Sequence, residues 1–211
     1  WRCNRLRWNK ISDAVVRRLS LYLRVLDDLA KNGDSQLISS QELGDKAGVG
    51  PALVRKDLAW FGEFGKQGVG YEVEFLRDEL RRILNLETDH KVVLVGAGSL
   101  GIALARYNIK RYQADDSFNL QIVGIFDSDP RKIGEIYEDI PVSPMENLEE
   151  FVREKHVKMA IITVPATVAQ DVAQKLIAGG VRAILNFAPI KLVVPDDIQV
   201  ASADLTLELQ R

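Results

Sequence analysis

The chain has 211 residues, of which 46% are hydrophobic and 27% are charged. This length fits one large domain or two small ones, and the composition is typical of a packed core, which excludes wholesale disorder and collagen-like repeats. The single cysteine, Cys3, excludes an internal disulfide and predicts a reducing, cytoplasmic setting. The two histidines lie far apart without a cysteine nearby, so no metal site is expected. No apolar run approaches the roughly 18 to 20 residues of a membrane helix.

The net charge of −2 combines regions of opposite sign. Residues 1–60 hold 11 basic and 7 acidic side chains, residues 61–90 hold 4 and 7, and the residues from 91 onward hold 13 and 16. The excess positive charge is therefore confined to the N-terminal end. A near-neutral total does not exclude a nucleic-acid partner, because such a partner needs only one basic region.

The N-terminal part predicts three helices. Apolar residues at alternating spacings of four and three indicate a helix over residues 12–31, which Gly33 helps to end. Its expected buried face comprises Val15, Leu19, Tyr22, Leu26 and Leu29. A capping-box sequence begins a second helix over about 39–47, and a proline suits the first position of a third, over about 51–61. A short glycine turn between the last two describes a helix-turn-helix.

A glycine-rich segment and one more helix follow. Four glycines among aromatic and β-branched residues in 62–73 are typical of a β-hairpin, the wing of a winged helix. An amphipathic pattern predicts a helix from Phe75 to Leu86, and residues 87–89 are expected to be a linker. The apolar side of this helix comprises Leu76, Leu80, Ile83 and Leu84.

After residue 90 the pattern changes to short apolar strands that alternate with helical stretches, which indicates a parallel, doubly wound α/β sheet. Strands are expected at 91–95, 120–126, 159–164 and 183–187, with short edge strands at 192–194 and 198–200. Residues 204–211 are expected to begin a helix.

The first of these strands leads into Gly-Ala-Gly-Ser-Leu-Gly. In a G-x-G-x-x-G loop, Gly96 permits a tight turn, Gly98 lets the backbone approach a pyrophosphate, and Gly101 permits close helix packing. The helix that follows presents its free N–H groups to the phosphates. We therefore predict a dinucleotide site that includes Gly96, Ala97, Gly98, Ser99, Leu100 and Gly101.

An acid at the end of the next strand favours NAD(H). Asp127 can accept hydrogen bonds from the adenine ribose and repel a 2′-phosphate, which disfavours NADP(H). The alternative is that the glycines serve packing and that Asp127 or Asp129 caps a helix. Asp129, which precedes Pro130, is the better candidate for a cap.

Two later strands also end in candidate site residues. Because ligands of doubly wound sheets bind beyond the carboxyl ends of strands, both ends can line the nicotinamide half of the site. The residues concerned are Thr163, Val164 and Pro165 after one strand, and Asn186 and Phe187 after the other. The alternative is a strand end in which Phe187 fills the core.

A catalytic proton donor is not evident. Dehydrogenases of this fold commonly use His, Lys or Tyr beside the hydride site. His156 precedes its strand, at the edge opposite the expected site, and the position four after Tyr107 is Arg111 rather than a lysine. The chain is therefore expected to bind a nicotinamide nucleotide without acting as an enzyme.

In the third helix, the predicted recognition helix, Val54, Leu58 and Phe61 are expected to be buried. Arg55 and Lys56 then point outward, where arginine can read guanine and lysine can hold phosphate. The alternative is a solvated charged pair. The predicted DNA-contacting residues are Ser40, Pro51, Arg55, Lys56 and Lys66.

The combination of a winged helix and a Rossmann domain resembles the Rex family of bacterial redox-sensing repressors over about residues 12–211. The resemblance rests on Val54–Leu58, Phe61–Gly62, Gly68–Tyr71, Gly96–Gly101, Phe126–Asp127 and Leu185–Pro189. It implies a transcriptional repressor that binds a palindromic operator as a homodimer and leaves it when NADH replaces NAD⁺. It also implies a last helix, beginning at residues 203–211, that is exchanged between subunits, and a polar switch of Arg24, Tyr107 and Asp204.

The predicted domains are a basic leader at 1–11, a winged-helix DNA-binding domain at 12–88, a Rossmann NAD(H)-binding domain at 89–202 and the swapped helix from 203. The leader is a DNA-contacting arm or an unrelated segment. Two other hypotheses stay open. The first is a small NAD-dependent oxidoreductase whose N-terminal helices mediate dimerisation, and the second gives the Rossmann domain another ligand such as coenzyme A.

Overall fold

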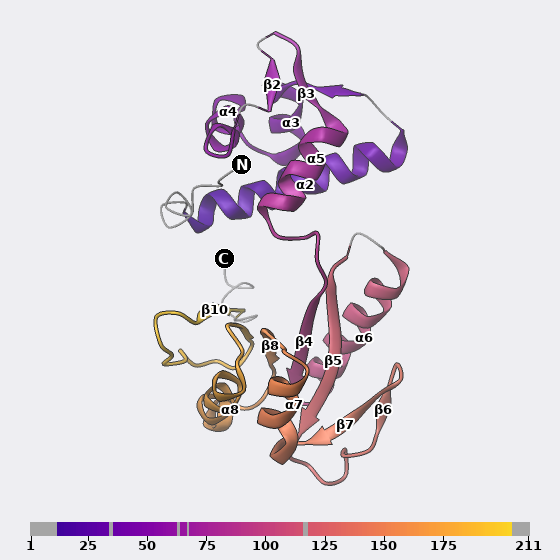
Figure 1. Cartoon of the computed structure of the whole chain (residues 1–211), viewed down its shortest axis with the longest axis vertical. Coiled ribbons are helices and arrows are strands. Elements are labelled where there is room, and N and C mark those ends of the chain that lie inside the picture. The colour runs from indigo at the N-terminus through magenta and orange to yellow at the C-terminus, as the bar shows by residue number, and fades with distance from the viewer. Residues whose placement is uncertain (1–11, 34–35, 63, 67, 116–117, 204–211) are drawn as a thin grey trace. The chain divides into compact units, whose positions relative to one another are not determined.

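The computed structural model describes residues 12–33, 36–62, 64–66, 68–115 and 118–203. The chain divides into two compact units, Trp1–Glu87 and Thr88–Arg211, whose elements are labelled in Figure 1. The predicted leader at 1–11 and the predicted swapped helix from Asp204 lie outside the described residues.

The first unit contains four helices and three short strands among its described residues. In chain order these are α2 (Asp13–Asn32), β1 (Leu37–Ile38), α3 (Ser40–Ala47), α4 (Pro51–Ala59), β2 (Gly65–Lys66), β3 (Gly70–Glu72) and α5 (Val73–Ile83). The helix-turn-helix and the wing are confirmed. Three helix boundaries were predicted wrongly, since α4 ends two residues early and α5 begins two residues early and ends three residues early.

Local sequence signals explain the helix ends of this unit. α2 ends at Gly33 in the left-handed conformation, with φ of 66°, where glycine has no steric cost. The Ser39 side chain accepts a hydrogen bond from the Glu42 N–H at 3.0 Å, as the capping box predicts. Every predicted apolar residue of α2 is buried, in a core shared with α3, α4 and α5. An unpredicted strand, β1, pairs with β3, so the wing is part of a sheet with the order β1-β3-β2.

The second unit is a seven-stranded sheet. Its elements are β4 (His90–Val95), α6 (Ser99–Ala114), β5 (Leu120–Asp127), β6 (Ile136–Tyr137), β7 (Ile140–Pro144), the 3₁₀ turn η1 (Met145–Asn147), α7 (Leu148–Glu154), β8 (Met159–Ile162), α8 (Ala166–Gly179), β9 (Ala183–Asn186) and β10 (Gln199–Ser202). The order is β10-β9-β8-β4-β5-β7-β6, and only the β6–β7 pair is antiparallel. This confirms the predicted Rossmann-like sheet.

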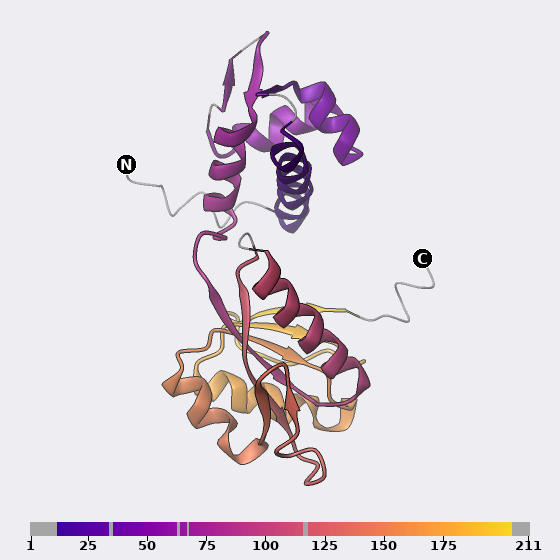
Figure 2. The ribbon, with the colours of Figure 1, turned by 90° about the vertical axis from the view of Figure 1, so that its right-hand side faces the viewer.

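The strands read as continuous apolar runs because both faces are packed. Alternate residues such as Val93 and Val95 face the core that α7 and α8 cover, while Val92 and Leu94 face the core beneath α6. Figure 2 shows the sheet between these helices. The chain runs from β4 outward to β5 on one side and returns to β8 on the other, which creates a switch point at the carboxyl end of β4.

One predicted strand is wrong. Residues 192–194 form no strand, and only the other predicted edge strand exists, as β10. The backbone of Val193 bonds instead to a side chain of α8: the Gln170 amide donates to the Val193 carbonyl and accepts from its N–H, both at 2.9 Å. Leu192 is buried in the core, so its apolar character reflects packing rather than strand pairing.

Candidate functional site

A cavity of about 750 Å³ lies at the carboxyl ends of β4, β5 and β8. This is the switch point of the sheet, where doubly wound folds bind their ligands. Its lining comprises Val95, Gly96, Gly98, Asp127, Ser128, Lys132, Met145, Glu146, Thr163, Val164, Pro165, Val168, Asp171, Val172 and Lys175. Six of the predicted nucleotide residues are thus brought together: Gly96, Gly98, Asp127, Thr163, Val164 and Pro165.

The three glycines of the loop differ in their steric surroundings. Gly96 has φ of 106°, and a Cβ there would lie 2.7 Å from the Thr163 carbonyl oxygen. A Cβ at Gly101 would lie 1.9 Å from the Gly96 carbonyl oxygen, so this position requires glycine for the helix to pack against the loop. Gly98 has open space around it and lines the cavity, which leaves its backbone accessible to a ligand.

Asp127 connects the glycine loop to the end of β5. Its carboxylate accepts hydrogen bonds from the Ala97 N–H at 2.7 Å, from the Asp129 N–H at 2.8 Å and from the Lys132 ammonium at 3.1 Å. Burial opposes its ionisation, but the bonds from Asp129, Lys132 and Ala97 outweigh burial and hold the pKa of Asp127 below its usual value. The cavity wall therefore carries a fixed anion, which keeps lone pairs for a further donor.

Asp129 is occupied by its own neighbour. Its carboxylate forms an ion pair with the Arg131 guanidinium at 2.7 Å and accepts from the Arg131 N–H at 3.0 Å. The hydrogen bonds from Arg131 lower the pKa of Asp129 to about 2. Asp129 therefore stabilises the turn after β5, while Asp127 lines the cavity.

Several cavity residues carry no signal in the sequence. Lys132 contributes a cation beside Asp127, and α8 adds the pair Asp171 and Lys175 from successive turns. Glu146 lies in the turn after β7. These residues follow no motif, because their place in the cavity depends on how the β5–β6 connection and α8 cross the edge of the sheet.

The structure places other predicted residues outside the cavity lining. Asn186 is fully buried, and its amide donates to the Ala188 and Ile190 carbonyls at 3.1 and 2.9 Å and accepts from the Ala188 N–H at 3.0 Å. It therefore shapes the loop after β9. Phe187 packs against the core beneath α6, as the alternative interpretation expected.

Four predicted loop residues lie outside the cavity lining, and two of them support the turn. Ala97 gives its N–H to Asp127, while Ser99 and Leu100 are exposed in the first turn of α6 and Gly101 is buried against the loop.

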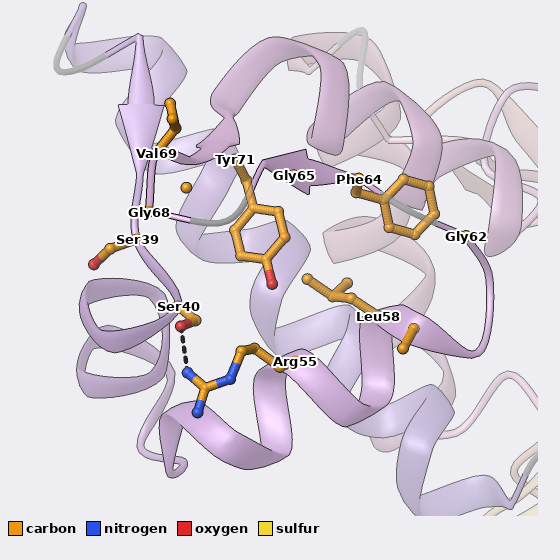
Figure 3. A pocket seen from close by; sticks show the side chains of 12 residues that line it. Ser39, Ser40, Arg55, Leu58, Gly62, Phe64, Gly65, Gly68, Val69 and Tyr71 are labelled. Atoms are coloured by element: carbon orange, nitrogen blue, oxygen red, sulfur yellow. Dashed lines mark hydrogen bonds between the residues drawn. The ribbon is translucent and has the colours of Figure 1, made fainter.

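The helix-turn-helix and the wing line a second pocket, with a volume of about 890 Å³. The Arg55 guanidinium donates to the Ser40 hydroxyl at 2.8 Å, which joins α4 to the first residue of α3. Figure 3 shows this bond and the Tyr71 ring pointing into the pocket from the wing. The lining also includes Ser39, Leu58, Ala59, Gly62, Phe64, Gly65, Gly68, Val69 and Gly70.

The other predicted DNA-contacting residues belong to the same elements that line this pocket or to their immediate neighbours in sequence. Lys56 is exposed on α4, Pro51 occupies the first turn of α4, and Lys66 belongs to β2 of the wing. Arg55 and Ser40 are therefore brought together by a hydrogen bond, while Lys56, Pro51 and Lys66 are placed only by the elements to which they belong.

The predicted switch residues lie on separate units. Arg24 is exposed on α2, and Tyr107, with 59% of its surface accessible, is exposed on α6. The Tyr107 hydroxyl accepts a weak hydrogen bond from Arg111 at 3.4 Å. Asp204 lies outside the described residues.

Within the described ranges, no group of three or more His, Cys, Asp or Glu side chains is arranged to hold a metal ion. The helices in those same ranges are all too short or too polar to cross a membrane.

Each unit matches its own family model, and relatives that share one name match nearly the whole chain. Residues 10–59 match a family described as "Putative DNA-binding protein N-terminus", and residues 87–190 match one described as "CoA binding domain". A protein of Chloroflexus aggregans named redox-sensing transcriptional repressor Rex is 50% identical over 94% of this chain and 91% of its own length. A protein of the same name from Brevibacillus brevis is 46% identical over 95% of this chain and 94% of its own length.

Solved structures agree with the sequence relatives. RSP in complex with β-NAD⁺ and operator DNA superposes with a TM-score of 0.88, at 40% identity, over 95% of this chain and 89% of RSP. RSP in complex with β-NADH superposes with a TM-score of 0.83, at 38% identity, over 95% of this chain and 91% of RSP.

Proposed function

Because this chain belongs to the Rex family of redox-sensing transcriptional repressors, we propose that it binds operator DNA as a homodimer and leaves the operator when NADH occupies the cavity of the second unit. The oxidoreductase hypothesis is set aside, since its relatives are named repressors and not enzymes. We also propose that the protein works in the cytoplasm.

The observation that carries this proposal is the cavity formed by the glycine loop and Asp127. Its open Gly98 backbone suits a pyrophosphate, and its buried carboxylate suits the two hydroxyls of an adenine ribose. The same carboxylate disfavours a 2′-phosphate, so NADH rather than NADPH is the expected signal. RSP, which shares the fold over nearly the whole chain, has been solved with both β-NAD⁺ and β-NADH.

DNA recognition belongs to the first unit. We propose that Arg55 reads a base edge in the major groove, since Ser40 already holds its guanidinium. Lys56 and Lys66 supply contacts to phosphates, while Ser40 and the start of α4 at Pro51 border the DNA-facing surface. The wing, with its glycines, approaches the backbone beside them.

Redox sensing requires only a difference in affinity. Reduced and oxidised nicotinamide differ by a hydride and one positive charge, so the DNA-free arrangement need only bind NADH better. A difference of about 10²-fold would supply roughly 2.7 kcal/mol, enough to move a balanced equilibrium decisively. We propose that Arg24, Tyr107 and Asp204 couple the two units in this change, and that the helix from Asp204 is exchanged between subunits.

A DNA-shift assay on palindromic operator DNA tests the proposal. NADH, NAD⁺, NADPH and coenzyme A are titrated separately, the last because the second unit matches a family described as a CoA-binding domain. Release by NADH alone is the expected result. Equal DNA affinity at saturating NADH and without nucleotide would refute the proposal. Release by coenzyme A would mean that the protein is a repressor whose signal is coenzyme A and not NADH.

A further inference from the structure

A buried carboxylate lies beneath the recognition helix. Asp57 of α4 is only 1% exposed, between the core residues Val54 and Leu58. Burying a carboxylate is costly unless an opposite charge and hydrogen bonds compensate for the lost water. Its presence on the inner side of the helix that carries Arg55 and Lys56 therefore requires a structural reason.

Both partners of this carboxylate come from α2. Arg18 donates from Nε to Oδ2 at 2.6 Å and from Nη2 to Oδ1 at 2.8 Å, and the Tyr22 hydroxyl donates to Oδ2 at 2.9 Å. Arg18 and Tyr22 are four residues apart and so lie on the same side of α2. Burial and the bond to Asp57 raise the pKa of Tyr22, so its hydroxyl keeps its proton and remains a donor.

The three hydrogen bonds fix the orientation of the Asp57 carboxylate as well as its distance from α2. A guanidinium fork that grips both oxygens sets the plane of the carboxylate, which apolar packing alone does not do. At about 100° per residue, Arg55 lies roughly 160° around the α4 axis from Asp57. A rotation of α4 about its axis would therefore displace Arg55 and break the contacts of Asp57 together.

From this arrangement we propose that Asp57 is a positioning residue for operator recognition: Arg18 and Tyr22 hold its carboxylate and thereby set the direction in which α4 presents Arg55. The proposal rests on the proposed function, because it gives the network a role in choosing the operator over other DNA. Asp57 itself, buried beneath α4, touches no DNA.

The substitution Asp57→Asn distinguishes a positioning role from a purely electrostatic one, because the two predict opposite changes in operator affinity. Asp57→Asn removes a negative charge from the DNA-binding unit and leaves Arg18 without its counter-ion, so attraction to phosphates should increase for every DNA sequence. Positioning predicts weaker binding to the operator and equal or stronger binding to unrelated DNA. The ratio of the two affinities therefore separates the two explanations.

The experiment compares full-length variants on two duplexes. One is the palindromic duplex that the wild-type chain selects from a randomised pool in the presence of NAD⁺, and the other has the same length and composition in scrambled order. The variants are Asp57→Asn, Tyr22→Phe and, as a matched control, Asp45→Asn, an exposed acid of α3 that accepts from Gln41. A wild-type chain that selects no duplex contradicts the proposed function itself rather than the role of Asp57.

The expected ratio of operator to scrambled affinity falls about tenfold or more for Asp57→Asn, falls about threefold for Tyr22→Phe, and is unchanged for Asp45→Asn. A smaller folded fraction lowers both affinities equally, so it does not move the ratio. A ratio for Asp57→Asn within about twofold of wild type overturns the proposal. If Asp57→Asn does not fold, Tyr22→Phe decides, and an unchanged ratio there overturns the proposal.

Discussion

The carboxylate of Asp127 accepts a 2.7 Å hydrogen bond from the backbone N–H of Ala97, the residue between the first two glycines of the loop. The acid that is expected to hold the ribose is therefore also the group that fastens the glycine loop to β5. Asp127→Ala should weaken NADH binding by about tenfold or more, because the carboxylate no longer accepts hydrogen bonds from the ribose. It should also lower the stability of the second unit by about 2 kcal/mol, because the hydrogen bond to the glycine loop is lost. NADH titration and thermal unfolding measure the two effects.

Asp129→Ala is the matched control for that substitution. It removes an acid two residues away whose carboxylate is paired with Arg131 rather than with the loop. Its NADH affinity should stay within about twofold of wild type. DNA binding without nucleotide should be unchanged in both variants, and a loss of DNA binding in Asp127→Ala would show that the carboxylate also acts on the first unit.

Two alanine substitutions should separate folding from ligand binding in the glycine loop. At Gly101 an added Cβ would lie 1.9 Å from a backbone oxygen, so Gly101→Ala should cost about 3 kcal/mol or more in stability. At Gly98 nothing lies within 4 Å of an added Cβ, so the fold should persist while the methyl group obstructs the pyrophosphate. Calorimetry and NADH titration check the pair, and equal stabilities would refute the steric argument.

The spacing of residues in the sequence predicted those features of the structure that depend on residues close together in the chain. The buried side of α2, the cap at Ser39 and the sequence from Gly96 to Asp127 are periodic or fixed patterns, and the structure contains them as predicted. Asp57 could not be found in this way. A single acid within a helix is usually solvated, and its partners Tyr22 and Arg18 lie 35 and 39 residues earlier.

The same limit explains the apolar run at 192–194. Its backbone partner is Gln170, 23 residues earlier on α8, and no periodicity links the two. Strand β1 is two residues long, too short for an alternating pattern, and it is defined by its pairing with β3. Such features depend on tertiary contacts rather than on the residues within one window.

Lys132 should moderate the choice between NADH and NADPH. Its ammonium lies 3.1 Å from the Asp127 carboxylate and partly neutralises the anion that opposes a 2′-phosphate. Lys132→Met should therefore raise the ratio of NADH to NADPH affinity by about tenfold. Lys110→Met, which removes an exposed cation of α6 paired with Glu138, is the control and should leave the ratio unchanged. A lower ratio in Lys132→Met would mean that the lysine serves NADH more than NADPH.

Arg55 and Lys56 should fail in different ways. Arg55→Ala removes the side chain that Ser40 holds, so discrimination between operator and altered operator should fall by about 1 to 3 kcal/mol. Lys56→Ala should weaken binding to all DNA and reduce the slope of log affinity against log salt by about one unit. Both variants should bind NADH normally. An unchanged salt slope would leave Lys56 as a solvated charge.

The stability of the second unit should depend on Asp127 at acid pH. Its folded-state pKa lies below the unfolded value of about 3.9, so its contribution to stability is complete above that value and is lost as pH falls through the folded pKa. The unfolding temperature of wild type should therefore drop more steeply below about pH 4 than that of Asp127→Asn, which has no proton to take up there. Calorimetry from about pH 5 down to 2 makes the comparison. Parallel curves would mean that the carboxylate gains nothing from Ala97, Asp129 and Lys132 in the folded state, and the bond that fastens the loop would then have no energetic role.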